Sequence, residues 1–118
     1  MSSPQQALQR APVSVFEDHA AEAAQFLKLM ANEHRLLVLC HLLTAGEMSV
    51  NALADEVGLS QSALSQHLAK LREDGLVTYR RDSQTLYYRL LDARAARVLG
   101  VLREIFCPDL GPQPKAAE

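Results

Sequence analysis

Two cysteines are the residues of this chain best suited to redox or nucleophilic chemistry. Cys40 follows the apolar run "LLVL", and Cys107 stands directly before Pro108, where an amphipathic pattern stops. The two residues are 67 positions apart in the chain. In a reducing compartment permanent disulfides are rare, so such a pair acts as buried thiols, metal ligands or a redox couple. The residues alone leave these three roles open.

The rest of the chain indicates a cytoplasmic protein of one domain. It has 118 residues, and 48% of them are hydrophobic, which is ordinary for a globular protein. The N-terminal segment "MSSPQQALQRAPVSVF" lacks the apolar centre of a signal peptide. The longest apolar run, "LLVLCHLL", is too short to cross a bilayer, so we expect no membrane association.

Apolar spacing predicts a mainly helical domain over residues 17–107, between a flexible arm at 1–16 and a flexible tail at 108–118. Helices are expected over 17–30, 33–46, 50–57 and 61–74, with a last helix after residue 91. Asn32, Ser49 and Ser60 are suited to cap the second, third and fourth helices. The segments "LVTYRR" and "TLYYRL" alternate and are rich in β-branched and aromatic residues, which predicts a β-hairpin.

The third and fourth helices are joined only by "GLS", which is typical of a helix-turn-helix. Leu64, Leu68 and Leu71 form one stripe of the fourth helix and are expected to face the core. The opposite face is polar and suits base edges in a DNA major groove, where glutamine can pair with adenine. Its candidate DNA-binding residues are Gln61, Ser62, Ser65, Gln66, His67 and Lys70. An exposed face of an ordinary helical bundle would have the same pattern.

The hairpin favours the DNA-binding interpretation, because a hairpin directly after the second helix makes a winged helix-turn-helix. Arg80 and Arg81 approach its tip and are expected to contact phosphates. Net charge agrees in sign: residues 60–91 contain 5 basic and 3 acidic side chains, a balance of +2, although the whole chain carries −2. We therefore predict a mainly α fold with a β-hairpin wing (α+β) that binds double-stranded DNA.

Residues 17–107 resemble the ArsR family of winged-helix repressors, most distinctively in "SQSALSQHLAKLREDGLV". The resemblance implies a homodimer, formed by the first and last helices, that reads an inverted-repeat operator. A monomer would leave the stripe Leu99, Leu102 and Phe106 partly exposed, which independently favours a partner on the last helix. The wing tip "RRDSQT" lacks the glycine that many members have there, so Gln84 and Thr85 are further candidate contacts.

The contexts "LVLC" and "IFC" resemble a branch of the family, the BigR-, SqrR- and HlyU-like repressors, that senses reactive sulfur species through two cysteines. The resemblance implies that low-molecular-weight persulfides link Cys40 to Cys107 through a polysulfide bridge and so release the operator. It implies no enzyme activity and no cofactor. Two inert core thiols are the alternative that the residues alone favour.

Metal sensing is the main alternative within the family. The thiolate motif that some members carry on the third helix is absent from "NALADEV", and the last helix "DARAARVLGVLREIFC" has no histidine. No two histidines are three or four positions apart, so we expect no metal site. A mixed site of both thiols with His19 stays open, as do a general redox response and a winged helix that binds protein.

Overall fold

The computed structural model describes residues 13–107, so the expected tail and most of the expected arm lie outside the described residues. The chain divides into two compact units, residues 1–31 and 32–118. The first contains α2 (Val13–Met30). This helix begins four residues before the predicted start at Glu17, because Val13 and Phe16 continue the helical spacing of Ala20. Four residues assigned to a flexible arm are therefore helical.

Helix α3 (Glu33–Ala45) forms the centre of the second unit. The Asn32 side chain caps it by accepting a hydrogen bond from the Arg35 N–H at 3.1 Å, as predicted. Val38, Leu39 and Leu42 are almost fully buried, and the helix packs against α4, α6 and strand β3. Gly46 ends it with a φ of 84°.

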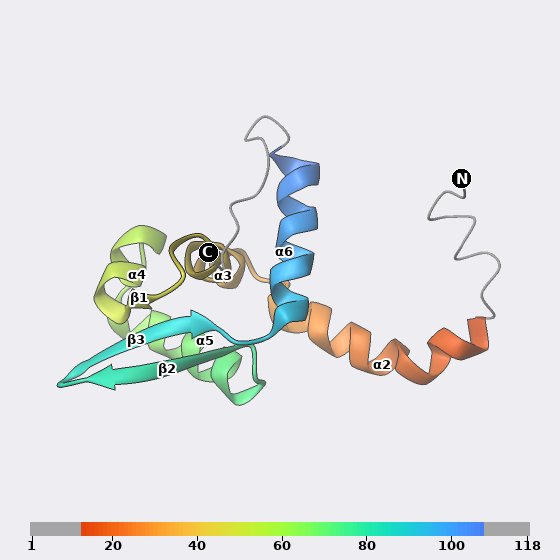
Figure 1. Ribbon diagram of the computed structural model, residues 1–118, viewed down its shortest axis with the longest axis horizontal. Helices are drawn as coiled ribbons and strands as arrows, with labels where there is room; N and C mark the ends of the chain where they lie inside the picture. The colour runs from red at the N-terminus through yellow and green to blue at the C-terminus, as the bar shows by residue number, and fades with distance from the viewer. Residues whose placement is uncertain (1–12, 108–118) are drawn as a thin grey trace. The chain divides into compact units, whose positions relative to one another are not determined.

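Helices α4 (Val50–Val57) and α5 (Gln61–Glu73) form the predicted helix-turn-helix (Figure 1). Ser49 and Ser60 cap them by accepting hydrogen bonds from Ala52 and Ala63. Gly58 sits between the helices with a φ of 71°, a left-handed conformation that favours glycine. Leu64, Leu68 and Leu71 of α5 are buried, as the leucine stripe predicts.

Strands β2 (Val77–Asp82) and β3 (Thr85–Leu90) form the predicted hairpin, which projects from the helices as a long ribbon (Figure 1). A third strand, β1 (Met48–Ser49), was not predicted; it pairs with β3, so the sheet order is β1-β3-β2. Two residues are too few to give an alternating pattern. Since Ser49 also caps α4, this strand joins the wing directly to the helix-turn-helix.

The last helix is α6 (Ala93–Phe106), which Asp92 caps and which contacts α3 and β3. The predicted stripe is partly exposed, but Leu99 is not part of its exposed surface: only 2% of Leu99 is accessible, because it packs into the core of the same chain. The exposed apolar residues of α6 are Val101, Ile105 and Phe106, with Phe106 75% accessible. None of the helices in the described part of the chain is long and apolar enough to cross a membrane.

Candidate functional site

The polar face of α5 is open to solvent over its whole length. Because the leucines at positions 64, 68 and 71 hold the opposite side in the core, the helix cannot rotate this face inward. Lys70 lies 3.3 Å from the Asp74 carboxylate, so an internal partner offsets part of its charge. The predicted DNA-binding residues that are exposed here are Gln61, Ser62, Ser65, Gln66 and Lys70.

His67 differs from these residues because it is half-buried against α3. Its Nδ1 accepts a hydrogen bond from Arg35 Nε at 3.3 Å, and its ring centroid lies 6.1 Å from that of His34. Burial, followed by the charges of Arg35 and His34, lowers the pKa of His67 from its ordinary value of 6.5. This imidazole is therefore neutral at pH 7, with its proton on Nε2, and it ties α5 to the first turn of α3.

The lowered pKa predicts how stability depends on acid. Below pH 6.5 the unfolded chain takes up a proton at His67 before the folded chain does. The free energy of unfolding should therefore fall as pH drops from 6.5 through the lower folded pKa, and the contribution should then level off. Urea titrations between pH 5 and 8 measure this slope. His67→Gln should flatten it, whereas an unchanged slope would show that His67 is not the responsible group.

At the wing, two arginines for which the sequence predicts the same phosphate contact have different surroundings in the structure. Arg81 is exposed near the tip, together with Gln84 and Thr85. Ser83 makes the turn with a φ of 58°, a left-handed conformation that is uncommon for residues other than glycine. Within the described chain Arg81 has no ion-pair partner, so its charge is available to a ligand.

Arg80, in contrast, is already bound within the molecule. Its Nε donates to both carboxylate oxygens of Glu47, at 3.1 and 3.0 Å, and its Nη2 lies 2.9 Å from Oε1. Its guanidinium also stacks 4.5 Å from the ring centroid of Tyr87. These hydrogen bonds raise the pKa of Arg80. Glu47 lies 33 positions away in the chain, so no local pattern reveals this pairing.

A second cluster holds the other face of the hairpin against α5. Arg72, near the end of that helix, lies 4.6 Å from the ring centroid of Tyr79, and Tyr79 lies 5.3 Å from Tyr88. Burial raises the pKa of the Tyr88 hydroxyl, which has lost much of its water. Both tyrosines were visible only as strand formers in the sequence, and their contact with Arg72 requires the fold.

The two cysteines are free thiols near the contact between α3 and α6. Burial is the largest influence on Cys40 and raises its pKa; the positive charge of Arg103 lowers it, and a negative Cys107 would raise it further. Both thiols are exposed, so neither is the inert core thiol of the alternative interpretation. Arg103 lies four positions before Cys107, and its Nε is buried without a hydrogen-bond acceptor in the described residues.

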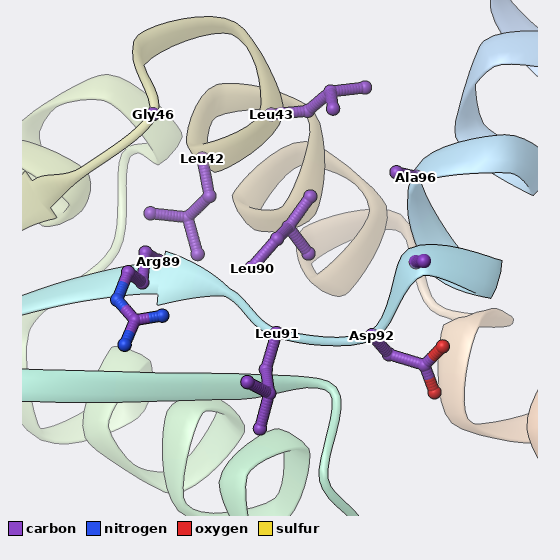
Figure 2. Close-up of a pocket in the computed structure, with 9 residues that line it drawn as sticks. Leu42, Leu43, Gly46, Arg89, Leu90, Leu91, Asp92 and Ala96 are labelled. Atoms are coloured by element: carbon purple, nitrogen blue, oxygen red, sulfur yellow. The ribbon is translucent and has the colours of Figure 1, made fainter. Parts of the chain in front are cut away.

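Within the described residues, neither cysteine belongs to a potential metal-binding cluster or lines the pocket described next. Among residues 13–107, no three side chains of His, Cys, Asp or Glu gather as a potential metal site. A pocket of about 250 Å³ lies between α3, the end of β3 and the start of α6. In Figure 2, Leu42 and Leu90 extend into this space, whereas Leu91 and Asp92 point away from it. Asp92 is also paired with Arg94 at 2.8 Å, so it is not free to bind a ligand.

Comparison with known proteins identifies relatives over most of the chain. Residues 32–79 match the family model described as "Bacterial regulatory protein, arsR family". The chain is 51% identical to the nodulation protein NolR of Rhizobium meliloti over 102 residues, which cover 86% of this chain and 82% of that protein. It is 45% identical to the transcriptional activator HlyU of Vibrio cholerae, over 85% of this chain and 94% of HlyU.

Solved structures agree with the sequence relatives. The repressor BigR from Xylella fastidiosa superposes with a TM-score of 0.76 at 39% identity, covering 82% of this chain and 98% of BigR. The predicted winged-helix fold and the family resemblance are thereby confirmed, and these relatives are regulators rather than enzymes. The chain belongs to the ArsR family of bacterial regulatory proteins and is a transcriptional regulator with a winged helix-turn-helix.

Proposed function

We propose that this regulator represses transcription by binding an inverted-repeat operator as a homodimer. The exposed face of α5 would lie in the major groove, where its amide and hydroxyl side chains meet base edges. Arg81, Gln84 and Thr85 at the wing tip would contact the flanking backbone, because the tip projects beyond the helices. The relative BigR is a transcriptional repressor, whereas HlyU is named an activator. The exposed polar face of α5 is what supports DNA binding most directly.

The homodimer is supported by the apolar surface of α6. Val101, Ile105 and Phe106 are each more than half exposed, and together they follow one side of the helix. Exposed clusters of large apolar side chains usually mark an interface. A second copy of the same chain would cover them, and a two-fold axis would then place two copies of α5 about one DNA turn apart.

We further propose that low-molecular-weight persulfides are the inducer and act on Cys40 and Cys107. The observation that carries this proposal is that two free, exposed thiols, 67 residues apart in the sequence, lie on α3 and at the end of α6, two helices in contact. Cys40 is exposed to solvent, yet the neighbouring protein atoms remove enough water from its thiol to raise the pKa, so it forms a thiolate less readily. Cys107, exposed at the end of α6, is the better candidate for the first attack.

The bridge would form in three balanced steps. The Cys107 thiolate takes the outer sulfur of one persulfide, RSSH, and releases RS⁻. The resulting Cys107 persulfide attacks the inner sulfur of a second RSSH, which releases HS⁻ and leaves a mixed trisulfide. The Cys40 thiolate then attacks the sulfur next to the R–S group, expels RS⁻ and forms a Cys40–Cys107 trisulfide. The second persulfide is the oxidant, and it is reduced to sulfide and thiol.

Selectivity for persulfide over peroxide would follow from the distance between the two cysteines. A direct disulfide requires Cα atoms about 4.4–6.8 Å apart. Each inserted sulfur lengthens the bridge by one bond of about 2 Å, so thiols held slightly too far apart accept a polysulfide bridge more easily than a disulfide. A general redox response predicts instead that peroxide links the same two residues.

Intact-protein mass spectrometry tests the inducer. The reduced protein is treated anaerobically with glutathione persulfide and, separately, with hydrogen peroxide. We expect an internally cross-linked monomer that has gained sulfur and lost two hydrogens, formed with persulfide alone. A cross-link without added sulfur in the peroxide sample would favour the general redox response. No reaction with either reagent, together with tight metal uptake, would favour a metal-responsive regulator.

A further inference from the structure

Arg80 crosses the outer face of the sheet, from one edge strand toward the other. In the register of the sheet, Arg80 of β2 lies opposite Tyr87 of β3, and Tyr87 lies opposite Ser49 of β1. Successive strand residues point to opposite faces, so Arg80 and Tyr87 share the face opposite the buried Tyr88. The Arg80 guanidinium covers the Tyr87 ring and reaches Glu47, the residue before β1.

The contact lies at the surface, with the Arg80 side chain 54% exposed, and its geometry is bidentate. Two guanidinium nitrogens face the two carboxylate oxygens of Glu47, which is the bidentate arrangement that a lysine cannot reproduce. Stacking on Tyr87 holds the guanidinium plane and removes part of its freedom before it meets the carboxylate. The pairing uses Nε–H and one Nη2–H, the edge of the guanidinium that would otherwise bind a phosphate in bidentate fashion, and leaves the Nη1 donors open.

The position of Glu47 in the chain determines which two elements this contact connects. Met48 and Ser49 follow it directly as β1, and Ser49 caps α4, the first helix of the helix-turn-helix. Arg80 thus connects the wing's outer strand to the chain segment that begins the helix-turn-helix. On the opposite face, Arg72 and Tyr79 connect the same strand to the end of α5. The hairpin is held from both faces, and only its tip is left unbraced.

We propose that Glu47, Arg80 and Tyr87 form a brace that sets the angle of the wing on the DNA, and that Arg80 is a positioning residue whereas Arg81 binds phosphate. This division of labour rests on the proposed binding of operator DNA. It reverses the simple expectation that both wing arginines contact the backbone. Glu47 acts as an internal substitute for phosphate, so the wing is oriented before DNA arrives.

Salt dependence of operator binding distinguishes a brace from a phosphate contact. Each phosphate contact contributes about −0.9 to the slope of log K against log salt concentration. Arg81→Gln, which removes one contact from each subunit of a dimer, should therefore make the slope less negative by about 1.8. Arg80→Gln should leave the slope unchanged and weaken binding about three- to thirtyfold, because the wing is no longer oriented. Glu47→Gln should weaken binding to a similar extent, and the double variant should be no worse than either single one.

The control is Arg89→Gln, which removes an exposed arginine from the wing base without touching the brace; affinity and slope should stay within about twofold of the parent. A less negative salt slope for Arg80→Gln, or tighter binding by Glu47→Gln, would overturn the proposed brace. Arg80 would then be a phosphate ligand that Glu47 masks. Thermal unfolding of the same single and double variants reports the coupling of Glu47 to Arg80 without DNA. If the effects of the two substitutions on unfolding are not additive while the parent protein binds no operator, the proposed function is refuted but the brace is not. If the two effects are additive, the brace itself is refuted.

Discussion

Ser65→Glu should abolish specific operator binding while leaving the fold intact. Ser65 is exposed in the middle of α5, so a glutamate is accommodated without disturbing the leucines beneath it. In the complex, the new carboxylate would face acceptor-rich base edges and phosphates. Losing the base-edge contact proposed for Ser65 costs about 1–3 kcal/mol of binding free energy in each half-site, and therefore about 2–6 kcal/mol in a symmetric dimer. Fluorescence anisotropy with a labelled operator at two salt concentrations measures the loss.

Two further variants separate the site from the added charge. Ser65→Ala removes only the hydroxyl and should weaken binding less than glutamate does. Thr44→Glu places the same charge on an exposed position of α3, outside α5 and the hairpin strands, and should bind nearly as the parent protein does. If Ser65→Glu bound the operator normally, α5 would not be the reading helix, and a winged helix that binds protein would become the better hypothesis.

Cys107→Ser should uncouple the repressor from its inducer without changing operator affinity in the reduced state. Cys107 is exposed at the end of α6 and makes no contribution to the core, so serine fits there without a packing defect. Persulfide should release the parent protein from DNA. Full release requires the bridge to offset the difference between specific and non-specific binding, about 4–10 kcal/mol for typical DNA-binding proteins. The variant should stay bound at the same persulfide concentration.

Cys40→Ser is the matched variant, because it keeps the proposed first nucleophile and removes its partner. It should still gain sulfur at Cys107 by mass spectrometry, yet it should form no internal bridge and should stay on the operator. Release of DNA by this variant would show that a persulfide on Cys107 is sufficient and that bridging is not required. Release of both variants would show that the inducer acts elsewhere in the molecule.

Local signals predicted the helices and the hairpin because their causes are local. Asn32, Ser49 and Ser60 each accept the predicted capping hydrogen bond, and Gly58 takes the left-handed turn expected between two short helices. The stripe of Leu64, Leu68 and Leu71 marked the buried side of α5 correctly. The start of α2 was misplaced because residues 13–16 add only one turn to an apolar pattern that is already weak.

Tertiary contacts account for what the sequence could not reveal. Leu99 has the spacing of an interface residue, yet it is buried in the core of its own chain. The apolar spacing of a helix shows which side is covered but not which neighbour covers it. Strand β1 exists only through its pairing with Tyr87 and Tyr88. Glu47 and Arg80, like Arg35 and His67, meet across more than 30 positions, and no periodicity connects them.

Helix α3 contains one of the two proposed sensing thiols and also a residue that contacts α5, the proposed reading helix. Cys40 lies five residues after Arg35, a rise of about 7.5 Å along one rigid rod. Arg35 holds His67 of α5, while Cys40 shares the neighbourhood of Arg103 and Cys107. A displacement of α3 at the thiols would therefore be delivered to α5 inside a single subunit. In the proposed homodimer, each subunit would therefore connect its own pair of thiols to its own α5.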